Sequence, residues 1–248
     1  MFYRQYAQAS TTSLSDDADD DEPTQSNFFA ADQPLLVDAT VQPHWSSKAT
    51  PSLKPKRALA SPIATVPPEI LIYILKHLAL PRDLFNALRV SRTWCECAIE
   101  LLWLKPTFSR ASTLEKVARL LKRPRSTFSY AKFIRRLNFL PLAETLKDDV
   151  FFAFSHCDRL ERLTLNGCKH LTAPALQSTL CNFPNLVAVD LTNVVDTTSD
   201  VIIAFASIAK RLQGINLQGC KKVTDSALTA LAENCPLLRR VKLSGLAA

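Results

Sequence analysis

An apolar residue recurs every 26 positions through the second half of the chain, at Ile134, Leu160, Leu186, Leu212 and Leu238. Each begins a similar hexapeptide, from IRRLNF to LRRVKL, whose first, fourth and sixth positions are apolar. Alternation at the fourth and sixth positions is typical of a β-strand with one buried face. A unit of this length cannot bury its own apolar face, so the recurrence predicts a stack of similar units.

The rest of each unit predicts a turn and then a helix. Seven positions after each start stands a turn-forming residue: Pro141, Gly167, Asn193, Gly219 or Gly245. The next position is apolar or cysteine and is expected to point inward: Leu142, Cys168, Val194, Cys220 or Leu246. Helical periodicity follows in residues 171–180 and 224–235. The repeated unit is therefore predicted to be strand, turn and helix.

This pattern resembles the cysteine-containing class of leucine-rich repeats, in which a cysteine ends each helix before the next strand. Cys157 and Cys235 occupy that place, and Phe183 and Ala209 substitute for it in the units between them. The resemblance implies an α/β solenoid with parallel strands on a concave face and helices on a convex face. Cys157, Cys168, Cys220 and Cys235 are then core residues, because they recur at repeat spacing rather than in paired metal-binding clusters.

A second constraint is the apolar stretch at residues 66–103. Prolines at 67 and 68 predict a helix start near Pro68, and the following ILIYIL run is apolar on every face. Pro81 is expected to break the chain, Asp83 to cap a second short helix and Ser91 to cap a third. Roughly 40 residues bury too little surface to stand alone, so the excess apolar face must meet the rest of the chain or a partner.

This stretch resembles the F-box, the module that docks substrate receptors onto the Skp-type adaptor of cullin-RING ubiquitin ligases. The likeness lies in the opening VPPEIL, the pair Ile74 and Leu78, the Asp83–Leu84 step, Trp94 and the closing Leu102–Trp103. It implies that residues from all three helices bind the adaptor, although some of the candidate residues must instead pack inside the domain. The candidate residues are Pro67, Ile70, Leu71, Ile74, Leu78, Leu84, Val90 and Trp94.

An F-box followed by such repeats resembles the substrate receptors of SCF ubiquitin ligases, and residues 130–138 resemble the fungal glucose-repression-resistant type. The resemblance implies a non-catalytic subunit without cofactors, which reaches cullin and RING subunits through the adaptor. Its repeats would bind proteins destined for ubiquitination and proteasomal degradation, including phosphorylated regulators. The side chains expected on the concave face include Arg136, Asn138, Arg162, Thr164, Asn216, Arg240 and Lys242, together with Ala188, Asp190 and Gly214.

Two other function classes remain open beside the ligase subunit. One is a repeat scaffold that binds partners without recruiting a ligase. The other is a basic nucleic-acid-associated factor, since residues 61–133 hold twelve basic and five acidic side chains within a net charge of +7 for the chain. Neither interleaved exposed aromatics nor a reading helix accompanies this charge, which disfavours nucleic acid.

Several classes have no support in the sequence. No HExxH, GxSxG, Walker or GxGxxG motif occurs, so no enzyme, metal or nucleotide site is expected. The longest apolar run, residues 201–209, is shorter than the roughly 18 to 20 residues of a membrane-spanning helix. The N-terminus has no apolar signal core, so reduced cysteines and a cytoplasmic or nuclear location are expected.

The expected organisation has four parts. Residues 1–60 read as a disordered tail rich in Ser, Thr and acidic residues, and residues 61–108 as the F-box. Residues 109–133 form a connector, in which Ser112 and Glu115 have capping-box spacing at the start of an amphipathic helix that Pro124 ends. Residues 134–248 are the repeats. Because the fifth unit stops after its turn, we expect the complete gene product to continue beyond residue 248.

Overall fold

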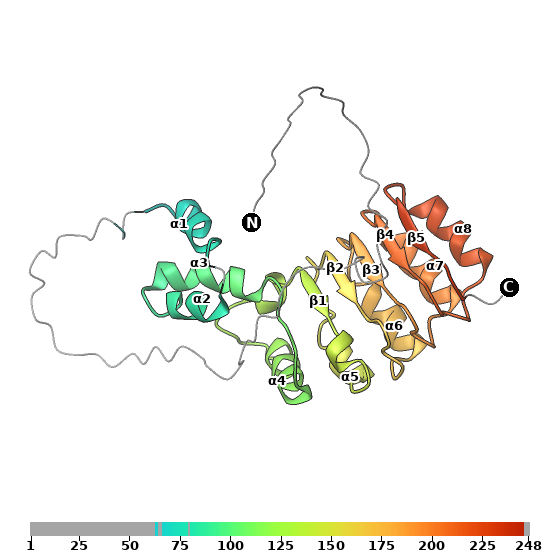
Figure 1. Cartoon of the computed structure of the whole chain (residues 1–248), viewed down its shortest axis with the longest axis horizontal. Helices are drawn as coiled ribbons and strands as arrows, with labels where there is room; N and C mark the ends of the chain where they lie inside the picture. Colours follow the sequence, from blue (N-terminus) through green and yellow to red (C-terminus); the bar gives the residue numbers. More distant parts are fainter. Residues whose placement is uncertain (1–62, 64–65, 79, 246–248) are drawn as a thin grey trace, which may run out of the picture. The chain divides into compact units, whose positions relative to one another are not determined.

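The computed structural model describes residues 63, 66–78 and 80–245, which form one unit by their contacts (Figure 1). The expected disordered tail and the inward position of Leu246 lie outside the described residues. Within the described part, no helix is long and apolar enough to cross a membrane, and no group of three or more His, Cys, Asp or Glu residues could hold a metal ion.

Three helices form the first part of this unit: α1 (Pro68–Leu75), α2 (Pro81–Ala87) and α3 (Arg92–Trp103). α3 packs against both α1 and α2. The predicted cap of α3 is confirmed, because Ser91 Oγ accepts a hydrogen bond from the Trp94 backbone N–H at 3.2 Å. The predicted cap of α2 is wrong. Pro81 opens that helix after Leu80, which makes no side-chain cap bond, so Asp83 lies inside the first turn and complements the helix dipole there.

The second part contains a five-stranded parallel sheet in the order β1-β2-β3-β4-β5. The strands are β1 (Arg136–Asn138), β2 (Arg162–Thr164), β3 (Ala188–Asp190), β4 (Gly214–Asn216) and β5 (Arg240–Lys242). Each strand pairs with the next in a register that joins residues 26 apart, such as Leu137 with Leu163. The fourth and sixth positions of the first four hexapeptides are buried, as the alternation predicts.

The turn after each strand follows the residue type at the seventh position. Gly167, Asn193, Gly219 and Gly245 all have positive φ, between 56° and 75°, which glycine and asparagine adopt more readily than other residues. Proline cannot adopt this conformation because its ring holds φ negative. Pro141 accordingly lies in a short 3-10 helix, η3 (Leu140–Leu142).

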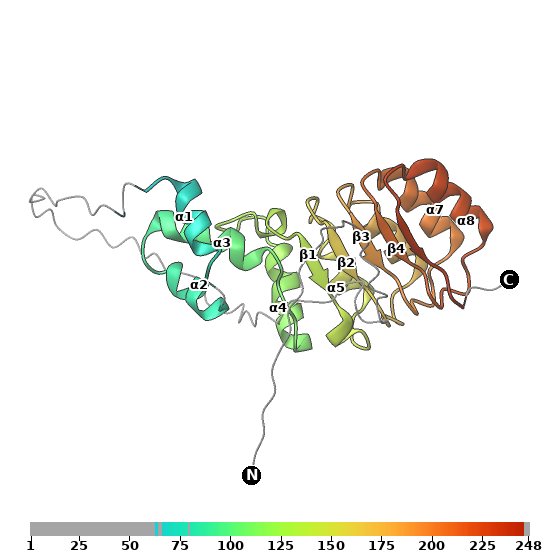
Figure 2. The ribbon, with the colours of Figure 1, turned by 45° about the horizontal axis from the view of Figure 1, so that its top comes forward.

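The helices lie beside one another along the sheet, in chain order (Figure 2). They are α4 (Ala111–Leu121), α5 (Asp148–Phe152), α6 (Ala173–Leu180), α7 (Ser199–Ile208) and α8 (Asp225–Asn234), each packed on the next. α4 begins at Ala111, after Arg110, without a side-chain cap bond, so the predicted capping box of Ser112 and Glu115 is wrong. α4 is the first helix in the row, and it buries the face that carries Leu114 and Val117.

Residues 103–108, which begin at the last residue of α3, repeat the hexapeptide pattern and lie along the edge of β1 that does not face β2. The Leu104 carbonyl accepts hydrogen bonds from the Arg135 and Arg136 N–H groups, at 2.9 and 3.1 Å. The Arg135 carbonyl accepts from Glu161 and Arg162 in the same way. Trp103, Pro106 and Phe108 are buried at the first, fourth and sixth positions of this segment, and Phe108 stacks on Phe139 with ring centroids 5.9 Å apart. These residues protect part of the edge of β1.

All seven cysteines are unpaired thiols, and six of them are buried. Cys157, Phe183, Ala209 and Cys235, the residues before each new strand, are all core residues. Burial raises the pKa of Cys157 and Cys168 to about 12 and that of Cys220 to about 11. Cys220 also donates its thiol hydrogen to the Leu191 carbonyl at 3.1 Å. These thiols therefore behave as apolar core groups rather than as nucleophiles.

Candidate functional site

The segment that contains α1 to α3 exposes several large apolar side chains. Ile70, Tyr73 and Ile74 on α1 are 53 %, 65 % and 48 % exposed, and Leu80 and Val90 are 60 % and 59 % exposed. Ile70, Tyr73 and Ile74 lie on one face because residues three and four apart in a helix are neighbours. The exposed apolar side chains of this segment, Ile70, Tyr73, Ile74, Leu80 and Val90, are together called the apolar face below.

The eight residues predicted to bind an adaptor divide into three groups. Pro67, Ile70, Ile74 and Val90 are exposed, whereas Leu78 and Trp94 are half-buried. Leu71 and Leu84 are buried in the core, at 2 % and 6 % exposure. The helical run contained no polar residue, so its sequence could not separate the inner Leu71 from the outer Ile70.

Two exposed members of the apolar face were not among the predicted residues. Tyr73 lies one turn from His77, with ring centroids 5.1 Å apart in an edge-on arrangement. Leu80 precedes α2 and contributes its side chain to the surface. Tyr73 could have been predicted from the sequence, because it lies three positions after Ile70 in the same helix. The position of Leu80 could not be predicted in this way, because it lies outside a helix.

The outward face of the sheet carries the second candidate surface. Arg136 and Arg162 are direct neighbours in the β1–β2 register, and Asn138 is the neighbour of Thr164. Arg162 and Asn138 are exposed, and Arg136 is half-buried. At the other edge, Arg240 is exposed and Lys242 is half-buried on β5. Paired strands are about 4.8 Å apart, so Arg136 and Arg162 place two cationic side chains side by side.

Three polar residues at the strand ends take part in local turns. Asn138 Oδ1 accepts a hydrogen bond from the Leu140 N–H at 3.0 Å, and Asn216 Oδ1 accepts from the Gln218 N–H at 3.2 Å. Asp190 Oδ1 accepts from the Thr192 N–H and hydroxyl. Asn138 and Asn216, both predicted to bind substrate, therefore have a structural role in ending their strands.

Burial further restricts the predicted substrate surface. Thr164 and Asn216 are buried, as is Asp190 between them on the sheet. The most accessible cations among the predicted residues are Arg162 and Arg240. A hexapeptide pattern identifies which side chains share a face, but their exposure depends on the neighbouring strands.

Lys105 is a further residue of this surface that was not predicted. Lys105 is the third residue of the segment 103–108, as Arg136 is the third residue of its hexapeptide. Pro106 and Phe108 correspond in the same way to Leu137 and Phe139. Because the Leu104 carbonyl pairs with the start of β1, Lys105 continues the row of cations at Arg136 and Arg162. The segment begins 31 residues before the next one instead of 26, so the 26-residue period does not identify it.

Three short helices with exposed apolar side chains are typical of a small protein-binding domain. Residues 63–109 match the family model described as F-box-like, so this segment is an F-box-like domain joined to an α/β sheet structure.

Two fungal relatives are similar over most of the chain. The SCF E3 ubiquitin ligase complex F-box protein pof2 of Schizosaccharomyces pombe is 24 % identical over 166 residues, which cover 67 % of this chain and 36 % of that protein. The Antagonist of mitotic exit network protein 1 of Eremothecium gossypii is 29 % identical over 198 residues, which cover 76 % and 48 %. The chain thus spans about a third to a half of the length of these curated relatives.

Proposed function

We propose that this protein is a substrate-recognition subunit of an SCF-type ubiquitin ligase. The observation that carries the proposal is the apolar face of Ile70, Tyr73, Ile74, Leu80 and Val90, located in the segment that matches the F-box-like family. Exposed large apolar side chains in such number within one short segment favour a protein-binding site. The fission-yeast relative, an SCF E3 ubiquitin ligase complex F-box protein, supports the same assignment.

The partner of this face in the proposal is a Skp-type adaptor, which links the chain to cullin and RING subunits. We expect Ile70→Ser combined with Ile74→Ser to abolish adaptor capture, because both side chains are about half exposed and would be desolvated by a partner. Leu71→Ala is a poor test, since Leu71 is a core residue whose loss would weaken the fold.

The test is a pull-down of purified Skp-type adaptor with the full chain. Leu140→Ser and Val195→Ser are the matched controls, because these side chains are 51 % and 53 % exposed but lie outside the helical segment. Unchanged adaptor capture by the double variant would contradict the proposal. A chain that folds but captures no adaptor at all would favour the scaffold alternative.

For the sheet region, we propose a leucine-rich-repeat solenoid of the cysteine-containing class. Its support is the 26-residue register of all four strand pairs, the left-handed turns and the buried residues that precede each strand. In such an array each unit contacts its neighbours, and the outward face of the strands is available to ligands.

We also propose that this outward face binds acidic or phosphorylated segments of protein substrates. Arg136 and Arg162 are adjacent, and arginine forms bidentate hydrogen bonds with phosphate and carboxylate groups. An anion bound between them would contact both guanidinium groups. Arg240 supplies a further exposed cation at the other edge of the sheet.

The test compares the proteins captured from fungal extract by the adaptor-bound chain, with and without prior phosphatase treatment. Arg136→Glu with Arg162→Glu should lose the phosphatase-sensitive partners but keep the adaptor. Lys116→Glu with Arg119→Glu on α4 makes the same charge change away from the sheet face and should keep both. Retention of every phosphatase-sensitive partner by the first variant would contradict the sheet-face site.

A further inference from the structure

Two hydroxyl residues in the chain follow an arginine at a distance of three positions: Thr113 after Arg110, and Ser126 after Arg123. An arginine at this place is the recognition element of many arginine-directed protein kinases, which read it through an acidic pocket and so select substrates by charge pattern. By sequence alone the two hydroxyls are equivalent candidates for phosphorylation.

The structure separates them. Thr113 lies in the first turn of α4, where its backbone N–H donates to the Arg110 carbonyl at 3.1 Å and its side chain is half-buried. A kinase cleft binds several consecutive substrate residues in an extended form, so α4 would have to unfold before Thr113 could react.

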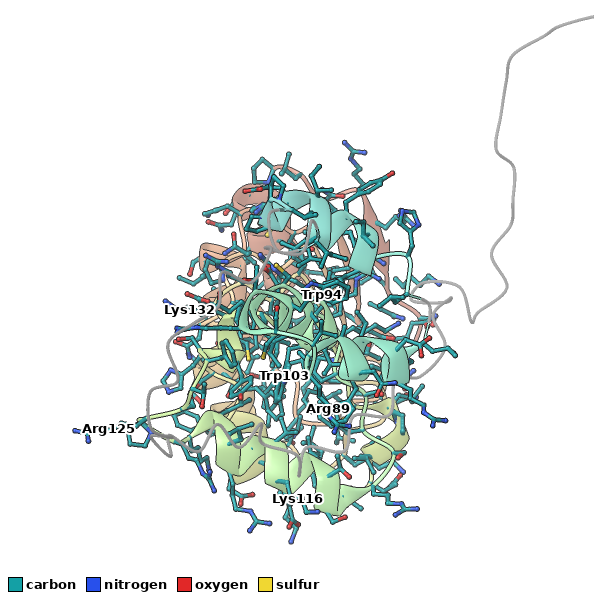
Figure 3. All side chains as sticks on the ribbon, turned by 90° about the vertical axis from the view of Figure 1, so that its left-hand side faces the viewer. Arg89, Trp94, Trp103, Lys116, Arg125 and Lys132 are labelled. Atoms are coloured by element: carbon teal, nitrogen blue, oxygen red, sulfur yellow. The ribbon has the colours of Figure 1, made fainter. Side chains whose placement is uncertain are left out.

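Ser126 lies instead in residues 122–129, which connect α4 with the short 3-10 helix η2 (Tyr130–Lys132). Ser126, Arg123 and Arg125 are all exposed, and Arg125 extends away from the body of the protein in Figure 3. An exposed loop of this kind can enter a kinase cleft without disturbing a helix or strand.

The Ser126 hydroxyl also has a defined structural role. Its Oγ donates a hydrogen bond to the Phe128 carbonyl at 2.6 Å, which holds the loop closed around Phe128. The Phe128 ring lies 5.9 Å from the Tyr130 ring and 6.4 Å from the Phe133 ring, between centroids, and packs against the core. Tyr130 in turn lies 4.5 Å from Trp103 at the end of α3.

We propose that Ser126 is a phosphorylation site for an arginine-directed kinase and that its modification releases Phe128 from this aromatic cluster. The terminal phosphoryl group of ATP passes to Ser126 Oγ, ADP leaves, and the hydroxyl proton goes to the catalytic base of the kinase. The resulting ester oxygen has no hydrogen to donate, and the phosphate dianion repels the Phe128 carbonyl. The inference is independent of the ligase function proposed above.

The first test measures site occupancy by mass spectrometry after incubation of the full chain with Mg-ATP and an arginine-directed kinase. Synthetic peptides covering residues 107–117 and 120–131 are used to choose a kinase that modifies both as free chains. In the full chain, Ser126 should be modified at least about tenfold more than Thr113, and Arg123→Gln should reduce its modification about tenfold. Arg110→Gln is the matched control and should change nothing at Ser126.

Three results would overturn the site: a 120–131 peptide that no arginine-directed kinase accepts, a full chain unmodified at Ser126 under conditions that modify the peptide, or equal modification of Thr113 and Ser126. The release of Phe128 is measured separately, as the rate of chymotryptic cleavage after Phe128. Phosphorylation should raise this rate several-fold, and Ser126→Ala should raise it in the same direction because it also removes the donor. An unchanged rate in the phosphorylated chain would overturn the release.

Discussion

Gly167 and Gly219 occupy the same turn position in different units but have different surroundings. Both have positive φ, 75° and 73°. A methyl group added at Gly167 would meet only the Ala143 Cβ, at 3.6 Å, whereas one at Gly219 would collide with the Asn193 Oδ1 atom. The two glycines therefore share a conformational requirement, and Gly219 has a steric requirement in addition.

We expect Gly167→Ala to lower the free energy of unfolding by about 1–2 kcal/mol, the cost of a left-handed conformation with a Cβ atom. Gly219→Ala should cost more, and Asn193→Gly should recover the difference by removing the colliding amide while keeping a residue that accepts positive φ at 193. Urea unfolding of Gly167→Ala, Gly219→Ala, Asn193→Gly and the double variant of Gly219→Ala with Asn193→Gly measures these values. Equal costs for the two alanine variants would contradict the steric argument.

The buried thiols make the free energy of unfolding depend on pH in the alkaline range. The pKa of Cys157 and of Cys168 rises from an ordinary 9.0 to about 12 on burial, so the folded chain holds these protons more tightly than the unfolded chain does. Their contribution to stability is complete below pH 9 and is lost as the pH rises from about 9 to about 12.

The urea midpoint of the native chain should accordingly fall between pH 9 and pH 11. Cys157→Ala with Cys168→Ala should be less stable at pH 8 but should lose less on the same rise in pH, because its unfolded state has two fewer thiols to ionise. Parallel declines for the two proteins would show that other groups dominate the pH dependence.

At the scale of single elements, two helix starts distinguish a capping side chain from an acidic residue in the first turn. Ser91 Oγ accepts a hydrogen bond from the Trp94 N–H and thereby satisfies one of the free donors of α3. Asp83 is in the first turn of α2, whose start at Pro81 has no side-chain cap. Only the first residue replaces a missing backbone partner.

Ser91→Ala should therefore cost about 1 kcal/mol of unfolding free energy, the usual value of an N-cap. Asp83→Asn should cost only a few tenths of a kcal/mol, since it loses the interaction of its charge with the dipole of a short helix. Thermal unfolding at low ionic strength compares the two. A larger loss for the Asp83 variant would restore the capping role that the sequence suggested for it.

At the scale of the whole molecule, Phe108 connects the helical segment to the sheet. It is buried, stacks on Phe139 and meets Phe154 edge-on, with ring centroids 5.9 and 6.0 Å apart. Four residues earlier, the Leu104 carbonyl accepts two hydrogen bonds from the start of β1. Both contacts belong to the segment that follows α3 directly.

Phe108→Ala should lower the free energy of unfolding by about 3–5 kcal/mol, the usual cost of a large buried cavity. The loss should reduce hydrogen-exchange protection in α3 and in β1 together, because the segment contacts both. Phe152→Ala, at a side chain that is 53 % exposed on α5, is the control and should cost far less. Loss of protection confined to the sheet would indicate that α3 and β1 unfold independently.

The local pattern of the sequence determined much of this structure. The 26-residue spacing predicted a stack of similar units, and the strands pair in a register that joins residues 26 apart. Glycine and asparagine predicted turns at positions 167, 193, 219 and 245, and proline and serine predicted the starts of α1 and α3. These features depend on residues close together in the chain or on a strict period, both of which can be read directly.

Tertiary contacts decided the remaining features, above all at the candidate sites. Ile70 and Leu71 are neighbours of the same chemical type, and only the packing of α3 places Leu71 in the core and leaves Ile70 outside. Thr164 was predicted to lie on the ligand-binding surface, but it is buried on β2, which lies between β1 and β3. The strand-like segment at 103–108 breaks the 26-residue spacing and is recognised only by its pairing with β1. Each outcome depends on which distant residues come into contact, and a single-sequence pattern does not contain that information.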